Sequence, residues 1–248
     1  MELFCDKSGQ IWAGTWGGGL SRILTTEEKD KLMNGNPLVK SVRFIRYQHD
    51  ANNLWSISSN AIYSIFEDRT GVMWVGTDLG GVNRFERDQA KFRIVRSEAG
   101  NSNTLSNNKI FAILLDKENQ VWFGTQDGLN IYDKNTKKYT HFRYDPDNNT
   151  SISHNVVRSI VEDPNGTIWL GTLLGLNKYD PKKRNFKRYY IDPHNPSSNN
   201  IISLLSTRNG KIWVGTYEHG LYQFDPNNEQ FIKYENKSHD PGDIGNEI

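Results

Sequence analysis

The sequence predicts an all-β fold built from repeated four-stranded antiparallel sheets, and three observations support this prediction. Aromatic residues make up 12% of a chain whose hydrophobic content is only 35%, which favours bulky core side chains on short strands. A ten-residue pattern with a tryptophan and a Gly-Thr pair returns at intervals of 62, 48, 47 and 44 residues. Turn-forming residues separate the apolar segments around each copy. The repeated tryptophans are Trp12, Trp74, Trp122, Trp169 and Trp213.

Each repeat contains four predicted strands. The first is an apolar run such as residues 61–66, and because it is apolar at both parities we expect both of its faces to be buried. An aspartate six residues before the tryptophan and a Gly or Asn three residues before it predict a tight hairpin turn. The tryptophan strand, a third strand that starts at a glycine, and an aromatic fourth strand such as residues 186–189 follow. Four antiparallel strands in a repeat of this length are typical of a β-propeller blade.

The register of the repeat predicts a single β-propeller region over residues 1–248. Its five units cover residues 1–59, 60–107, 108–154, 155–198 and 199–245, with approximate boundaries. Residues 24–42 are a polar, lysine-rich insertion for which we expect a loop or a short helix. An asparagine stands fourteen residues before four of the tryptophans, and Asn246 is its next copy, so residues 246–248 start a further unit. Since both chain ends then fall within a strand, we expect a fragment of a larger propeller.

Composition and motifs exclude several other classes of function. The stretch IWAGTWGGGL, residues 11–20, is glycine-rich like a phosphate loop, but its four further copies and the lack of a long helix after it argue against a nucleotide site. Thirty basic and 29 acidic residues leave a net charge of +1, which indicates no nucleic-acid partner. Cys5 is the only cysteine, so an intrachain disulfide is excluded. No apolar run approaches the roughly 20 residues of a membrane span, and the first residues do not resemble a signal peptide.

Residues 60–85, NAIYSIFEDRTGVMWVGTDLGGVNRF, and residues 155–179 resemble the two-component regulator propeller repeat. The resemblance extends over nearly the whole chain, with Thr207 in place of the repeat's aspartate and Asn119 in place of its glycine as local departures. It implies a segment of the extracytoplasmic, periplasmic sensor region of a hybrid two-component regulator of Bacteroidetes, in which seven-bladed propellers sense glycan breakdown products. It further implies an oligosaccharide ligand, a homodimer of the parent sensor, and signal relay to a histidine kinase that this chain does not contain.

Residues that differ between units are the candidates for ligand binding, because residues shared by all units are explained by blade architecture. The loops after Gly-Thr and the inner strands supply candidates with the aromatic faces and planar polar groups that sugars require. These candidates are Trp16, Tyr63, Asp78, Gln126, Asp127, Arg158, Tyr217, Glu218 and His219. The repeated tryptophans are assigned to the core. The asparagines that precede the first strand of a unit are assigned a structural role in the turn into that strand; they are Asn60, Asn108, Asn155 and Asn199.

The sequence gives little indication of a metal site, a cofactor site or a catalytic site. Residues 145–151, DPDNNTS, lack the central glycine and terminal glutamate of a calcium loop, and the six histidines have no metal-ligand spacing. Glu218 and His219 are adjacent, and the chain resembles the streptogramin lyase propeller more distantly, but a general base needs a second convergent group. The basic run at residues 182–188 could bind phosphate or a sulfated glycan, although protection of an edge strand explains it more simply. We therefore expect a non-enzymatic sensor without metal or cofactor, with a propeller lyase or an interaction scaffold as the alternatives.

Overall fold

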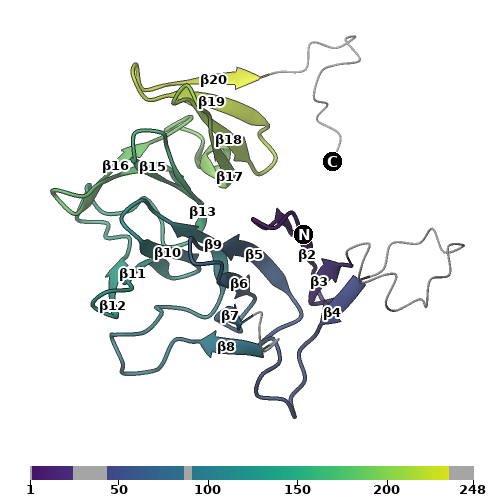
Figure 1. The fold of residues 1–248 in the computed structure, drawn as a ribbon. Helices are drawn as coiled ribbons and strands as arrows, with labels where there is room; N and C mark the ends of the chain where they lie inside the picture. The colour runs from purple at the N-terminus through teal and green to yellow at the C-terminus, as the bar shows by residue number, and fades with distance from the viewer. Residues whose placement is uncertain (1, 25–43, 87–90, 235–248) are drawn as a thin grey trace, which may run out of the picture. The chain divides into compact units, whose positions relative to one another are not determined.

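The computed structural model describes residues 2–24, 44–86 and 91–234, and these form twenty strands in five four-stranded antiparallel sheets (Figure 1). In every sheet four consecutive strands lie in sequence order, which is the blade arrangement expected from the repeat. The expected insertion falls on residues 25–42 beyond Leu24, and the expected sixth unit falls on residues 246–248; both lie outside the described residues.

The chain divides into two units, Met1–Ile113 and Leu114–Ile248, which we describe separately. The first unit holds blade 1, with β1 (Glu2–Cys5), β2 (Ile11–Gly14), β3 (Leu20–Ile23) and β4 (Phe44–Tyr47). It also holds blade 2, with β5 (Ile62–Glu67), β6 (Met73–Thr77), β7 (Val82–Glu86) and β8 (Lys91–Val95). The boundary between the units falls inside β9 (Ile110–Leu115), the first strand of blade 3.

The second unit contains the remaining strands. Blade 3 continues with β10 (Gln120–Thr125), β11 (Gly128–Asp133) and β12 (Lys138–Phe142). Blade 4 consists of β13 (Val157–Glu162), β14 (Ile168–Thr172), β15 (Gly175–Asp180) and β16 (Asn185–Tyr189). A short 3-10 helix, η2 (Pro196–Asn199), precedes blade 5, which consists of β17 (Ile201–Ser206), β18 (Ile212–Thr216), β19 (Leu221–Asp225) and β20 (Gln230–Tyr234).

The hairpin between the first two strands of each blade forms as the sequence predicts. The residue three positions before the tryptophan adopts positive φ in all five blades, as Gly9, Gly71, Asn119, Gly166 and Gly210. Asparagine replaces glycine in blade 3 with a φ of 67°, which its short polar side chain tolerates. The prediction of tight turns at these positions is confirmed.

The glycine of the Gly-Thr pair lets successive blades approach each other closely. In the first unit, a Cβ added to Gly14 would lie 2.6 Å from Ile62 Cγ2, and one added to Gly76 would lie 2.9 Å from Ile110 Cγ2. In the second unit, a Cβ added to Gly171 would lie 2.5 Å from Ile201 Cγ2. Each isoleucine is the first apolar residue of the next blade's inner strand and is fully buried. The repeated glycine is therefore required for packing between sheets as well as for the local turn.

The expectation that every first strand is buried on both faces is wrong for β1, where Leu3 is 68% exposed, and for β17. Ile202 is 40% exposed and Leu205 is 63% exposed, whereas Ile201 is fully buried. Burial of the second face of a strand requires a neighbouring sheet, and no described strand packs an isoleucine against Gly215 of this blade. The apolar run alone could not reveal this difference, because units 2 to 5 all carry one.

Candidate functional site

The repeated aspartate binds both the hairpin and the tryptophan. One carboxylate oxygen of Asp163 accepts backbone N–H groups from Asn165 and Thr167 at 2.9 Å each, and the other accepts the Trp169 indole N–H at 3.0 Å. The indole bond recurs with Asp6, Asp68 and Asp116, at 2.8, 3.1 and 2.7 Å. Sequence reasoning assigned this aspartate to the turn alone and missed the indole bond, although the constant six-residue spacing was a signal for it. These carboxylates are structural and already occupied.

The shared asparagines, serines and threonines also make internal contacts. The side-chain oxygens of Asn60, Asn108, Asn155 and Asn199 each accept a backbone N–H from the segment that enters the blade, at 2.6 to 2.7 Å. Buried Asn83 accepts the Ser58 N–H at 2.9 Å and donates to Ser58 Oγ at 2.7 Å. Thr77 Oγ1 donates to the Gly81 carbonyl at 2.8 Å, which closes the loop after Gly-Thr. Residues common to all blades thus serve the scaffold, and the variable residues are left for binding.

In the first unit, three aromatic side chains from successive repeats form a row that we call the aromatic cluster: Trp16, Tyr63 and Phe111. Trp16 lies in the loop after β2, is 66% exposed, and meets the Tyr63 ring edge-on at 5.3 Å between centroids. Tyr63 on β5 meets Phe111 on β9 edge-on at 5.1 Å. An antiparallel bridge between Trp16 and Ala61 fixes the loop on the next blade. The cluster presents a partly open aromatic surface with a defined geometry.

A cation and a carboxylate lie beside the aromatic cluster. Lys109 Nζ lies 5.5 Å from the Tyr63 ring centroid and 5.7 Å from that of Phe111, and 3.0 Å from Asp78 Oδ1. The hydrogen bond to Asp78 raises the pKa of Lys109 against the opposing effect of burial, and a bond with Tyr63 adds to the rise. The structure thus brings Trp16, Tyr63 and Asp78 together. Sequence reasoning missed Lys109, although it occupies a position where the other units have Ala, Val or Asn.

Replacing Asp78 with asparagine is expected to lower the pKa of Lys109 toward the ordinary lysine value of 10.5, because the hydrogen bond to Asp78 is the largest cause of the rise. A raised folded-state pKa stabilises the fold fully below the unfolded value, and this contribution disappears as pH rises through the folded value. An NMR titration of the lysine side chains measures the shift. Asp127→Asn is the control, since Asp127 pairs with Arg143 instead, and an unchanged Lys109 titration in Asp78→Asn would contradict the assignment.

The remaining candidates lie in the second unit and form separate groups. Gln126 is exposed directly after β10, and the neighbouring Asp127 accepts hydrogen bonds from Arg143 Nε at 3.1 Å and Nη2 at 2.9 Å. Arg158 is half-buried on β13.

In the loop after β18, Tyr217 is 51% exposed and Glu218 has a φ of 66°. His219 Nε2 lies 3.0 Å from Ser197 Oγ. Glu218 and His219 therefore share a loop, but the histidine ring forms its hydrogen bond with a serine hydroxyl and not with a carboxylate.

The described residues contain no group of three or more His, Cys, Asp or Glu side chains that could hold a metal ion. Within residues 145–151, Asp145 Oδ1 accepts the Asp147 N–H at 3.0 Å and Asn148 Oδ1 accepts the Thr150 N–H at 2.9 Å. These oxygen atoms accept backbone N–H groups within turns. Among the described segments, no helix has the length and apolar character of a membrane span.

The model of the two-component regulator propeller family matches residues 56–78, 104–127, 151–173 and 195–218. Each match covers the entry to a blade, its first two strands and the loop after Gly-Thr. The chain carries two-component regulator propeller repeats. The propeller repeats lie in blades 2 to 5, and the serine, asparagine and Gly-Thr pair within them are the residues whose structural contacts are described above.

Solved structures share this fold. Two structures described as extracellular domains of hybrid two component systems from B. thetaiotaomicron align with TM-scores of 0.72 and 0.70, at 22% and 25% identity. They cover 93% and 94% of this chain, while the chain spans only 29% and 30% of their length. A streptogramin B lyase aligns over 94% of this chain and 67% of its own, with a TM-score of 0.62 and 15% identity, which shows the fold alone. No curated protein matches the chain significantly in sequence.

Proposed function

We propose that the chain is a ligand-sensing segment of the periplasmic part of a hybrid two-component regulator, and that it binds glycan-derived oligosaccharides at the aromatic cluster. The propeller repeats and the likeness to extracellular domains of such systems support the class of protein. The exposed Trp16, held against Tyr63 beside the Lys109–Asp78 pair, supports the ligand class. A sugar ring offers an apolar face to an aromatic side chain and hydroxyl groups to a neighbouring cation and carboxylate.

The proposed mechanism is a coupling between ligand binding and the packing of successive blades. Trp16 comes from blade 1, Tyr63 from blade 2, and Phe111 from the first strand of blade 3, so one ligand on the cluster contacts several repeats at once. A ligand shifts a conformational equilibrium only by its difference in affinity for the two states. Relay to a kinase outside this chain, through a homodimer of the parent sensor, is part of this proposal.

Replacing Trp16 with alanine is expected to weaken oligosaccharide binding by about tenfold or more, because the exposed indole is the anchor of the site. Isothermal titration calorimetry of the whole chain against a panel of tetrasaccharides measures the affinity. Trp55→Ala is the matched control: Trp55 is also an exposed tryptophan in a loop, at 48%, but it packs under Lys91 and not in the cluster.

Three outcomes of this titration would contradict the proposal. Equal losses in Trp16→Ala and Trp55→Ala would place binding elsewhere. Conversion of a tetrasaccharide to products would favour the propeller lyase. No heat across the panel would favour an interaction scaffold.

A further inference from the structure

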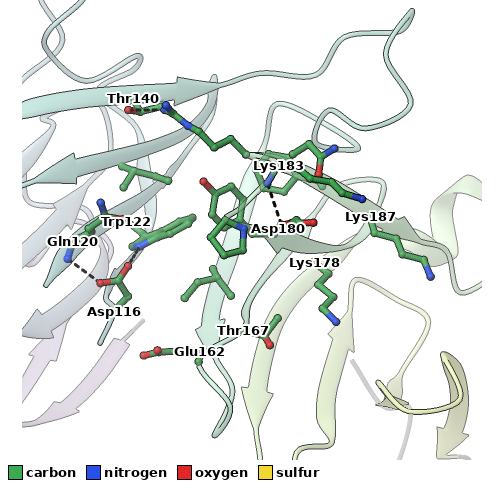
Figure 2. A pocket seen from close by; sticks show the side chains of 18 of the residues that line it. Asp116, Gln120, Trp122, Thr140, Glu162, Thr167, Lys178, Asp180, Lys183 and Lys187 are labelled. Atoms are coloured by element: carbon green, nitrogen blue, oxygen red, sulfur yellow. Dashed lines mark hydrogen bonds between the residues drawn. The ribbon is translucent and has the colours of Figure 1, made fainter. Parts of the chain in front are cut away.

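A groove in the second unit, which shares no residue with the aromatic cluster, lies between strands β10 to β12 of blade 3 and the β15–β16 hairpin of blade 4 (Figure 2). Its volume is about 1530 Å³. The buried side chains of Trp122, Ile131 and Phe186 form part of its lining. Polar residues of connecting loops complete the wall, including Asn149 and Thr150 in the loop before β13 and Thr167 in the β13–β14 hairpin. The groove is large enough for an oligosaccharide of several rings.

Basic side chains gather on the hairpin side of the groove. The lining contains seven of them: Lys117, Lys138, Lys178, Lys183, Arg184, Lys187 and Arg188. Figure 2 shows Lys178, Lys183 and Lys187 on the β15–β16 side with Asp180 among them, while Asp116 and Glu162 lie apart from these lysines. Much of the basic run at residues 182–188 therefore faces a groove, beyond the edge protection that explains it from sequence alone.

The carboxylates of the lining are largely held by partners within the fold. Asp116 accepts the Trp122 indole and the Gln120 backbone N–H. Asp180 accepts the backbone N–H groups of Lys182 and Lys183 at 2.9 and 3.1 Å. Glu229 accepts Lys187 Nζ at 2.6 Å and the Tyr189 hydroxyl at 3.0 Å, and these contacts lower the pKa of the Glu229 carboxyl.

Three lysines of the same lining form no ion pair with a carboxylate of the described residues. In the part of the chain that the structure describes, Lys138, Lys178 and Lys183 have no carboxylate within 4.0 Å of Nζ. Lys178 Nζ lies over the Trp169 ring, 5.6 Å from its centroid, and Lys138 and Lys183 are exposed. These ammonium groups are available for an external anion without breaking an existing ion pair.

We propose that this groove is a second binding site, which takes an oligosaccharide bearing carboxylate or sulfate groups. The lysines attract its anionic groups, and the amide and hydroxyl groups of Asn149, Thr150 and Thr167 are placed for sugar hydroxyls. Tyr190, which is 40% exposed, adds an aromatic surface at the lining. The site lies outside the aromatic cluster, and its ligand is selected by charge.

Charge-reversal substitutions at two adjacent lysines test whether the groove binds an anionic oligosaccharide. Lys183 lines it, whereas Lys182, the preceding residue in the same turn, does not. Calorimetry of the whole chain uses tetragalacturonate, a chondroitin sulfate tetrasaccharide and neutral xylotetraose, so that carboxylate and sulfate sources are distinguished. Lys183→Glu is expected to weaken binding of the anionic tetrasaccharide by roughly tenfold, and Lys182→Glu to change it little. Higher ionic strength is expected to weaken binding by the unsubstituted chain.

Other results would overturn the proposal. These are no binding of either anionic tetrasaccharide to the groove, equal losses in Lys183→Glu and Lys182→Glu, or equally tight binding of xylotetraose. Equal affinity for a tetraglutamate peptide would remove the sugar assignment. Trp16→Ala is expected to leave groove binding unchanged, so failure of the groove and failure of the site at the aromatic cluster are distinguishable.

Discussion

Replacing Asp163 with alanine is expected to lower the free energy of unfolding by about 3 kcal/mol, because one buried carboxylate satisfies three N–H donors. Asp163 is 5% exposed and accepts the Asn165 and Thr167 backbone N–H groups together with the Trp169 indole. Alanine would leave the N–H group of the Trp169 indole without an acceptor, and Trp169 is only 1% exposed, so water could not replace the lost hydrogen bond. Thermal and urea unfolding followed by tryptophan fluorescence measure the loss.

Two controls separate the contribution of the indole hydrogen bond to stability from that of the turn. Asp133→Ala removes two backbone acceptor contacts in an exposed turn, to Asn135 and Thr136, and is expected to have a much smaller effect. In blade 5, Thr207 replaces the aspartate, and among the described residues the Trp213 indole donates no hydrogen bond. Trp213→Phe should therefore lower the free energy of unfolding less than Trp169→Phe, because the latter leaves one Asp163 carboxylate oxygen without its indole donor. Equal losses in the two tryptophan variants would refute the role of the bond.

Replacing Gly171 with alanine is expected to destabilise the second unit by about 2 kcal/mol through overpacking between blades 4 and 5. The added Cβ would lie 2.5 Å from Ile201 Cγ2, and it would also collide with Ser159 Oγ of the same blade. Ile201 is fully buried, so the neighbouring blade must shift to accommodate the methyl group. Differential scanning calorimetry measures the expected fall in Tm.

Gly215 supplies the matched control for this prediction. A Cβ at Gly215 would meet Ser203 Oγ as the one at Gly171 meets Ser159 Oγ, but no isoleucine of another blade lies near it among the described residues. Gly215→Ala is expected to cost less than Gly171→Ala, and the difference measures the interblade contact alone. If the two alanine variants lose the same stability, contact with the next blade is not the reason for the repeated glycine.

The positions and order of the strands could be predicted because each repeat carries its own signals. Asn119 and the glycines at its position mark the hairpins through their tolerance of positive φ, and the apolar runs mark the inner strands. Burial of those strands could be predicted less well. Leu205 belongs to the same kind of apolar run as the other inner strands but is 63% exposed, since burial depends on what packs against the strand.

The candidate site could be predicted in part. Trp16, Tyr63 and Asp78 stood out because they differ from the other repeats at matching positions, and the structure brings them together. Lys109 was missed because its importance comes from Asp78 and Tyr63 of the preceding blade, which no local pattern connects to it. The groove beside β15 and β16 was missed for the same reason, since its walls come from two different blades.

The sequence by itself determined the blade: four strands, a tight hairpin, and a tryptophan that is buried in the core of blades 1 to 4, whereas Trp213 of blade 5 is only partly buried. It could do so because hydrogen-bonded turns and alternating side chains act over a few residues. The tertiary structure alone decided which variable side chains meet, because neighbouring blades bring residues from different repeats into contact. The Lys109–Asp78 pair and the set of lysines around Lys183 exist only through that packing, and each proposed ligand depends on them.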